Sequence, residues 1–355
     1  MSIHPLIRFA AGFAALCAPI AAAAEPSPAQ LEHQQASVST SEGLTLAAYI
    51  SRPRGASGPL PSLFLTQSVA CGSIAPRKDR LARQERVALA ANYALIRVER
   101  AGTGASEGEG CDALDYETEV RHYREAFDQL RSHPWVDQSN IVVIGSSLGS
   151  TVAPLVAQDK PVTGVVVQGA GALTYFERMM LFDRLQLERQ ADFMPDAIDR
   201  EMRRRLAFHY RYLIEQKTPA EIAAEHPDLQ GVWESLVGTD ASPHYGRPYA
   251  WHWQAAEQNW LAAWAGLEVP IMVVFGEYEQ FESRHGHRAI VDLVNRLRPG
   301  TATWLEIPQA GHGLRVYDNP LDAYARNNGV RQPELFVEPV AAWLKRLGAA
   351  TDPSP

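Results

Sequence analysis

The feature that most constrains the fold is a series of short apolar runs separated by segments with helical spacing. Continuous apolar runs bounded by turn residues are typical of strands that are covered on both faces. Such runs occur at 61–67, 93–99, 140–146, 162–169, 270–276 and 302–308. Helical patterns occupy 81–91, 116–131, 148–157, 285–297 and 334–347. This alternation predicts an α/β fold with a mostly parallel, doubly wound sheet and right-handed crossovers.

The region before these runs has a different period. Residues 36–51 alternate between apolar and polar side chains on both sides of a turn at Ser41-Glu42-Gly43. Alternation with a period of two is typical of strands with one buried face. We therefore expect an N-terminal antiparallel hairpin.

A long segment without strand patterns interrupts the alternation. Between about Leu173 and Leu267 only helical patterns are present, and Thr218-Pro219-Ala220-Glu221 has the form of a capping box with proline at the first helical position. We interpret 173–267 as a helical cap inserted between two parts of the core, 25–172 and 268–348. Residues 349–355, rich in proline and serine, are expected to form a flexible tail.

The N-terminal residues 1–24 resemble an export signal. Arg8 precedes an apolar run that ends in Ala22-Ala23-Ala24, and the run is shorter than the roughly 20 residues that a membrane span requires. We expect cleavage near Ala24 and a periplasmic or secreted protein, with a buried helix or a membrane anchor as the alternatives. No later stretch could span a membrane, and a net charge of −8 argues against nucleic acid or anionic lipid as partners.

The run at 140–146 leads into Gly145-x-Ser147-x-Gly149 at the start of a helical pattern. A serine on a sharp strand-to-helix turn occupies a strained conformation, and glycines on either side let chain segments pass closely. The turn would raise Ser147 above the sheet edge and direct the Leu148 N–H at a developing oxyanion. The pattern predicts a nucleophile elbow, with a purely structural glycine-rich turn as the alternative.

A serine nucleophile needs a base and an orienting acid, in the chain order serine, acid, histidine. Glu279 follows the apolar run at 270–276, and His312 follows the run at 302–308. Both leave the carboxyl ends of consecutive strands, where the sites of open α/β sheets lie. We predict a catalytic triad of Ser147, His312 and Glu279, with Glu277 and Glu282 as the alternative acids, and no cofactor or metal.

The loop after the run at 61–67 is expected to complete the oxyanion hole through the N–H of Ser68 or of Val69. Cys71 lies on this loop, and Cys111 lies on the loop after the run at 93–99. Since those two strands are neighbours in a doubly wound sheet, we expect a Cys71–Cys111 disulfide in an oxidising compartment. Two separate buried thiols are the alternative.

Three further patterns are assigned no function. Gly102-Thr103-Gly104 resembles the start of a dinucleotide fingerprint, but Glu107 occupies its third glycine position. His285-Gly286-His287 has metal-ligand residue types without a partner motif, so we expect a plain loop there. Arg203-Arg204-Arg205 is interpreted as the solvated face of a helix.

Taken together, these motifs resemble the α/β-hydrolase superfamily. "ERAGTGASEG" at 99–108 is similar to the R-x-G-x-G-x-S segment of its secreted esterase and prolyl-oligopeptidase-like branches. Matched residue by residue, the resemblance implies Ser147, Glu279 and His312 as the triad. Glutamate replaces the family's usual aspartate at 279, and "TQSVAC" at 66–71 replaces the commoner His-Gly oxyanion loop.

The expected function is hydrolysis of a small or oligomeric carboxylic ester through an acyl-enzyme. A serine peptidase or a secreted acyltransferase would use the same triad, and a non-catalytic binding protein is the remaining alternative. The predicted cap also carries aromatic residues that could line an apolar pocket: Phe176, Tyr245, Tyr249, Trp251, Trp253, Trp260 and Trp264.

Overall fold

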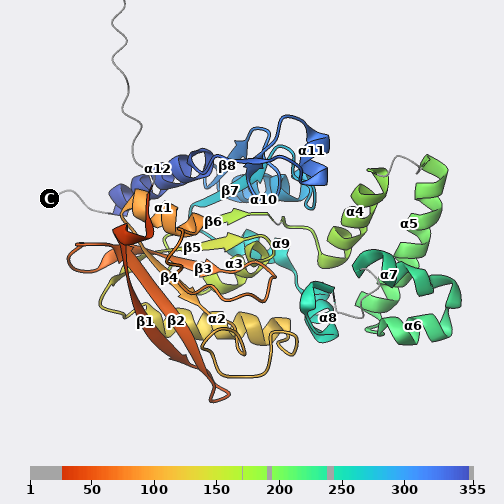
Figure 1. Cartoon of the computed structure of the whole chain (residues 1–355), viewed down its shortest axis with the longest axis horizontal. Helices are drawn as coiled ribbons and strands as arrows, with labels where there is room; N and C mark the ends of the chain where they lie inside the picture. The colour runs from red at the N-terminus through yellow and green to blue at the C-terminus, as the bar shows by residue number, and fades with distance from the viewer. Residues whose placement is uncertain (1–25, 170, 190–193, 238–243, 352–355) are drawn as a thin grey trace, which may run out of the picture.

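The computed structural model describes residues 26–169, 171–189, 194–237 and 244–351 (Figure 1). The predicted export signal 1–24, with Ala24, lies outside these residues. The predicted tail 349–355 begins within the last helix, which extends to Thr351, and its final four residues also lie outside them.

A single eight-stranded sheet in the order β1-β2-β4-β3-β5-β6-β7-β8 forms the centre of the molecule. From β4 to β8 all neighbours are parallel, whereas β2 pairs antiparallel with both β1 and β4. The predicted α/β fold and its N-terminal antiparallel hairpin are therefore confirmed. The strands are β1 (Leu31–Ser39), β2 (Thr45–Pro53), β3 (Leu60–Thr66), β4 (Ala94–Val98), β5 (Val136–Ser146), β6 (Gly164–Gln168), β7 (Ile271–Gly276) and β8 (Ala302–Ile307).

Helices cover both faces of this sheet because the inner strands are apolar on both sides. In β3, Phe64 faces one core cluster while Leu63 and Leu65 face the other. Helices α1 (Arg83–Ala91) and α12 (Glu334–Thr351) pack on one face, whereas α2 (Tyr116–Leu130), α3 (Gly149–Ala157) and α10 (Arg284–Leu297) pack on the opposite face. Alternate side chains of the inner strands are thus buried against one helical layer or the other.

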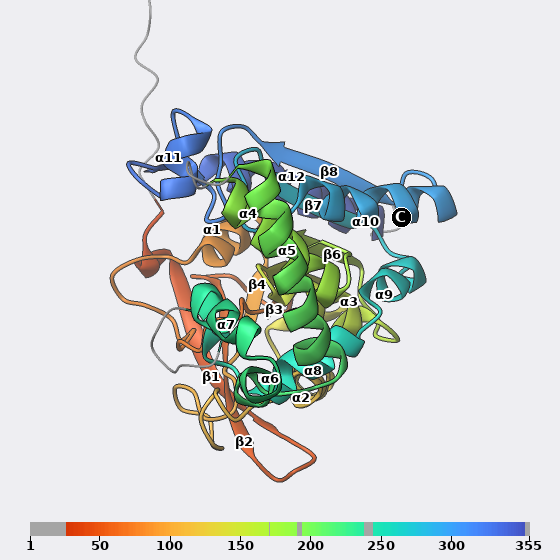
Figure 2. The same cartoon turned by 90° about the vertical axis from the view of Figure 1, so that its right-hand side faces the viewer.

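The described residues between β6 and β7 form helices joined by short connections, with no strand among them. Helices α4 to α7 form a group to one side of the sheet (Figure 1), and α4 and α5 lie across the front of the sheet in the perpendicular view (Figure 2). The elements are α4 (Tyr175–Glu188), α5 (Pro195–His209), the π-helical turn η2 (Tyr210–Ile214), α6 (Pro219–Glu225), α7 (Gln230–Val237), α8 (Tyr249–Glu257) and α9 (Trp260–Gly266), with short 3₁₀ turns η3 (Pro227–Leu229) and η4 (His244–Gly246).

The last of these helices packs with the core. Helix α9 lies against α3 and α10, and the Trp260 indole N–H donates to the hydroxyl of Tyr116 on α2 at 3.1 Å. Trp260 and Trp264 are almost fully buried. These two tryptophans were among the aromatic residues that could line a pocket, but they pack in the core between the sheet and helices α2, α3 and α10.

Two smaller sequence interpretations were wrong. His285-Gly286-His287 forms the first turn of α10 instead of a loop, with the Ser283 hydroxyl accepting from the Gly286 N–H. Arg205 is buried and pairs with Asp183 at 3.1 Å, so the arginine run at 203–205 is only partly a solvated face. The acidic partner on α4 is 22 residues away in sequence and could not be read from the local pattern.

The C-terminal part adds a two-stranded ribbon of β9 (Arg315–Val316) and β10 (Val330–Arg331), with α11 (Pro320–Ala325) between them. A short turn η1 (Pro28–Gln30) precedes β1. Within the described ranges, none of the helices combines the length and the apolar character needed to cross a bilayer.

Candidate active site

Ser147 lies on a strained turn between β5 and α3. Its φ of 51° is in the left-handed region that residues other than glycine rarely adopt. The turn is held by its backbone, since the Ser147 N–H donates to the Gln168 carbonyl at 2.7 Å and the Ser150 N–H donates to the Ser147 carbonyl at 2.8 Å. The sequence pattern Gly-x-Ser-x-Gly therefore corresponds to a sharp elbow at the end of a central strand.

Positions 145 and 149 of the elbow require glycine because other backbone segments approach them closely. A Cβ atom at Gly149 would lie 2.2 Å from the Gln67 carbonyl oxygen and 2.3 Å from that of Thr66, and one at Gly145 would lie 2.7 Å from the Ser150 Cα. A real Cβ never approaches a backbone atom so closely. The elbow thus packs directly against the loop that follows β3.

Replacing Gly149 by alanine is expected to separate these two segments. Overpacking a rigid backbone contact costs about 1 to 3 kcal/mol, so unfolding in urea should show a loss of that size. Gly231→Ala is the matched control, because its Cβ would meet nothing within 4 Å and alanine favours a helix by about 0.5 to 1 kcal/mol. Equal stability of the Gly149→Ala variant and the wild type would contradict this reading.

The structure brings the three predicted triad residues together. The Ser147 hydroxyl lies 3.0 Å from Nε2 of His312, and Nδ1 of the same ring lies 2.9 Å and 3.0 Å from the two carboxylate oxygens of Glu279. Serine, imidazole and carboxylate form one hydrogen-bonded chain, with residues from the ends of β5, β7 and β8 meeting at one sheet edge. Such a chain can pass a proton from the hydroxyl to the ring.

Burial and charge set the protonation of this chain. The Glu279 side chain is 1% exposed and that of His312 is 19% exposed. Burial acts to lower the pKa of His312, but the facing Glu279 carboxylate outweighs it and brings the pKa above its usual value of 6.5. Burial would raise the pKa of Glu279, yet His312 and the Phe281 N–H, which donates at 2.9 Å, bring it below 4.5.

The alternative acids occupy other environments. Glu277 is exposed and accepts from the Gln309 N–H at 2.8 Å. Glu282 is buried and pairs with Arg178 of α4, whose Nε lies 2.6 Å from its carboxylate. Burial raises the pKa of Glu282 despite this pairing. Of the three carboxylates, only Glu279 has a hydrogen bond to His312 among the described residues.

Two glutamines that the sequence reasoning missed hold the histidine loop. Gln168, at the end of β6, donates to the His312 carbonyl at 2.8 Å, and Gln280 accepts from the His312 N–H at 2.8 Å. Arg83 supports the same loop by donating to Gln168 and to the Gly313 carbonyl. The position of Gln168 at the carboxyl end of a strand beside the elbow was the available signal.

The candidate oxyanion donors lie on the adjoining loop and at the start of α3. Among the hydrogen bonds of the described residues, none is donated by the backbone N–H of Ser68, Val69 or Leu148. Leu148 has helical backbone angles directly after the strained serine. These three amides thus lack an acceptor among the described residues, as an oxyanion donor must before a substrate binds.

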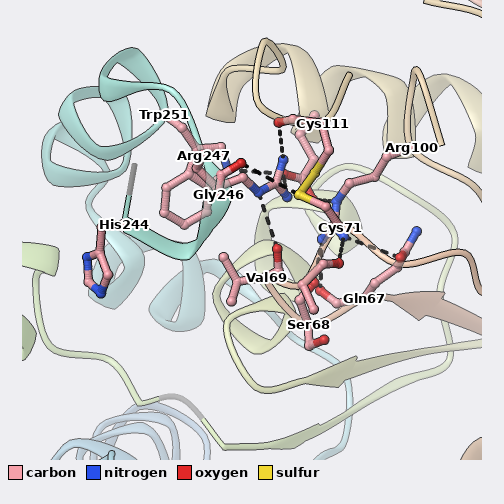
Figure 3. The surroundings of a disulfide bond; sticks show 12 residues. Gln67, Ser68, Val69, Cys71, Arg100, Cys111, His244, Gly246, Arg247 and Trp251 are labelled. Carbon is pink, nitrogen blue, oxygen red and sulfur yellow. Dashed lines mark hydrogen bonds and ion pairs between the residues drawn. A yellow bond between two sulfur atoms is a disulfide. The ribbon is translucent and has the colours of Figure 1, made fainter. Parts of the chain in front are cut away.

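Cys71 and Cys111 form a disulfide, with their Cα atoms 5.7 Å apart (Figure 3). The prediction from strand order is confirmed, because β3 and β4 are parallel neighbours and their loops leave the same sheet edge. The bridge ties the loop after β3 to the loop after β4. It closes a loop of 40 residues.

Removing this bridge is expected to destabilise the fold. Closing a loop of this length lowers the entropy of the unfolded chain by an amount worth about 3 to 4 kcal/mol. The Cys71→Ser/Cys111→Ser variant should lose about that much in urea unfolding relative to the oxidised wild type. The reduced wild type should match the variant, and a loss below about 1 kcal/mol in both would contradict the prediction.

The comparisons with known proteins agree with this architecture. The family model described as "Alpha/beta hydrolase family" matches residues 78–327. No curated protein matches the sequence significantly. Among solved structures, DcsB in complex with its substrate analogue is 15% identical with a TM-score of 0.55, covering 90% of this chain and 100% of DcsB.

Two further solved structures are similar over comparable lengths. The alpha/beta hydrolase GrgF from Penicillium sp. sh18 is 17% identical with a TM-score of 0.53, covering 90% of this chain and 99% of its own. Carboxyl esterase 2 from Tuber melanosporum is 14% identical with a TM-score of 0.52, covering 92% and 89%. At these identities the likeness to the solved structures shows a shared fold only. The family match, in contrast, is a match of sequence and covers well over half of the chain. The chain therefore belongs to the alpha/beta hydrolase family.

Proposed function

We propose that this protein is an exported serine hydrolase that cleaves carboxylic esters through a Ser147–His312–Glu279 triad. The single observation that carries the proposal is the hydrogen-bonded chain from the Ser147 hydroxyl through the His312 ring to the Glu279 carboxylate, with distances of 3.0 Å and 2.9 Å. A serine hydroxyl is a weak nucleophile until a base accepts its proton, and this chain supplies both the base and the group that orients it.

The reaction would proceed in two half-reactions. His312 Nε2 accepts the hydroxyl proton while Ser147 Oγ attacks the ester carbonyl, and the resulting oxyanion is held by the N–H groups of Leu148 and of Ser68 or Val69. The imidazolium then gives its proton to the leaving alkoxide, and an acyl-enzyme remains. Water, deprotonated by the same ring, releases the acid and restores Ser147.

Glu279 contributes by orientation and charge. Its carboxylate accepts from Nδ1–H of His312, which leaves Nε2 as the acceptor that faces Ser147. The Phe281 N–H and the Glu282 N–H donate to the same carboxylate oxygen at 2.9 Å and 3.3 Å. The raised pKa of His312 is consistent with a ring that gains stability when it becomes charged during the reaction.

We also propose that the helical segment 173–267 acts as a cap over the site. Phe281 stands edge-on to the His312 ring with centroids 5.1 Å apart, and Phe182 of α4 stacks on Phe281 at 6.0 Å. Arg189, just after α4, donates to the Gln280 carbonyl. The first helix of this segment therefore borders the histidine, where it can shape the space for an acyl or alcohol group.

A fluorophosphonate probe tests the catalytic proposal directly. We expect the wild type to be labelled at Ser147 and the Ser147→Ala variant to stay unlabelled. Turnover of p-nitrophenyl esters with short to medium acyl chains, and little turnover of aminoacyl p-nitroanilides, would favour an esterase over a peptidase. Adding an acceptor alcohol and finding transfer exceeding hydrolysis would favour an acyltransferase. Absence of labelling would end the proposal.

Export is tested by fractionating cells that produce the full chain. The proposal expects the protein outside the cytoplasm, with an N-terminal sequence that starts near Glu25. The disulfide is compatible with an oxidising compartment. A full-length cytoplasmic protein that begins at the initiator methionine would refute this part of the proposal without affecting the triad.

A further inference from the structure

Two buried arginines bind the backbone carbonyls of the loop that carries the candidate oxyanion donors Ser68 and Val69. Arg100 follows β4 and donates to the carbonyls of Ser68 at 2.6 Å and Ala70 at 2.7 Å. Arg247 precedes α8 and donates to the Val69 carbonyl at 3.3 Å. Arg100 also donates to the Gln67 carbonyl at 3.4 Å. Four consecutive carbonyls, from Gln67 to Ala70, are therefore bound by guanidinium groups from two distant parts of the chain (Figure 3).

Both arginines form ion pairs with the same carboxylate. Glu119, in the first turn of α2, lies 2.6 Å from Arg100 and 2.7 Å from Arg247. It also accepts from the Trp251 indole N–H at 3.0 Å. All three charged side chains are at most 3% exposed. Burial alone would raise the pKa of Glu119, but the two guanidiniums hold it below 4.5.

The geometry of the peptide unit connects these bonds to the oxyanion hole. In a trans peptide the carbonyl and the following N–H point in opposite directions, and none of the peptide bonds described is cis. The Ser68 carbonyl, held by Arg100, belongs to the peptide that carries the Val69 N–H. The Val69 carbonyl, held by Arg247, belongs to the next peptide, which carries the Ala70 N–H. The two peptide planes that flank Val69 are thus fixed by different arginines, one from the core and one from the 173–267 segment.

Arg247 also connects to the disulfide that restrains this loop. It donates to the Cys111 carbonyl at 3.4 Å, and its guanidinium lies 5.5 Å from the ring centroid of Trp251. Because Arg247 and Trp251 both reach Glu119, any displacement of this part of the cap would move the partner of Arg100 as well.

From this arrangement we infer that Arg247 is a positioning residue of the oxyanion loop. It holds the Val69–Ala70 peptide, which adjoins the peptide that carries the Val69 N–H, and it shares Glu119 with Arg100, which holds that donor peptide itself. The segment leading into α8 thus restrains the Val69 N–H from its C-terminal side and through Arg100. The inference rests on the proposed function, since it assigns Arg247 a role in the same acyl transfer. Among the described residues, the hydrogen bonds of Arg247 go to Val69, Cys111 and Glu119 and not to the triad.

Replacing Arg247 by methionine should weaken stabilisation of the transition state more than binding of the substrate. Removing one oxyanion donor lowers kcat about 10²- to 10³-fold, and displacing a donor should cause only part of that loss. We expect kcat for p-nitrophenyl butyrate to fall about 10- to 100-fold per titrated active site, with KM changed less than about threefold. Affinity for a trifluoromethyl ketone, which forms a tetrahedral oxyanion on the serine, should fall by the same factor as kcat/KM.

Arg205→Met is the matched control. Arg205 is also a buried arginine of the same segment, but it pairs with Asp183 instead of Glu119. It should keep kcat and ketone affinity per active site within about twofold of the wild type. Counting only active sites titrated with a fluorophosphonate removes the contribution of unfolded protein. Should Arg247→Met not fold, Arg247→Lys decides, because it keeps the charge beside Glu119 but loses the planar fork of donors, and a threefold or greater loss in kcat is expected.

The inference is overturned if the folded Arg247 variant retains the wild-type kcat and ketone affinity, or if Arg205→Met loses as much. Wild-type protein that neither turns over esters nor reacts with the probe would instead refute the proposed function. The two failures are therefore distinguishable in the same set of measurements.

Discussion

Alanine at Ser147 or at His312 is expected to lower kcat for p-nitrophenyl butyrate by about 10⁴-fold or more, and the two substitutions together should cost little beyond either one. The reason is that the hydroxyl and the ring act as one unit. Without the ring the hydroxyl keeps its proton, and without the hydroxyl the ring has no nucleophile to activate. The 3.0 Å separation between Ser147 Oγ and His312 Nε2 is the structural basis of this non-additivity.

Single-turnover and steady-state kinetics of both single variants and the double variant would check this result. Circular dichroism should show that all three keep the wild-type fold, since neither side chain fills the core. Multiplicative losses, in which the double variant is slower by the product of the two single effects, would mean that the residues act independently. That outcome would contradict a triad built on Ser147 and His312.

The strand ends explain why much of this arrangement could be predicted from sequence. Parallel strands leave their carboxyl ends at one edge, so the residues after β5, β7 and β8 converge whatever the loops between them contain. The same reasoning placed Cys71 beside Cys111, because β3 and β4 are neighbours. These inferences needed only strand order and the positions of a few polar residues.

Partners that depend on packing across the chain could not be predicted in this way. Arg247 and Glu119 are separated by 128 residues, and no periodic pattern relates them. The burial of Arg205 against Asp183 is of the same kind, because an arginine on a helix shows no local sign of its acidic partner. Helix α9 also packs on the core, although its sequence continues the helical pattern of the segment that was predicted to form a cap. Sequence motifs thus predicted which residues lie at the strand ends. The side chains that hold those residues in place could be identified only from the tertiary structure.

Glu279→Gln is expected to lower kcat by about 10³- to 10⁴-fold and to shift the acid limb of the pH profile downward. The sign follows from charge. The Glu279 carboxylate stabilises the protonated ring and raises the pKa of His312 above 6.5, and catalysis requires the neutral ring, so kcat/KM of the wild type should rise with pH through a midpoint above 6.5. A neutral amide removes that stabilisation, and the midpoint should then fall. The amide can also donate to Nδ1, which favours the tautomer that cannot accept from Ser147.

The matched control for this substitution is Glu277→Gln. Glu277 is exposed and accepts from the Gln309 N–H, so its loss should leave kcat and the midpoint of the acid limb unchanged within error. Profiles of kcat/KM between about pH 5 and pH 9 for the wild type and both variants bracket the titration of the ring. If the acid limb of Glu279→Gln stays where it is in the wild type, or if Glu277→Gln moves it instead, then His312 takes its charge stabilisation from another group. The buried Glu282, which also raises the pKa of His312, would be the next carboxylate to replace.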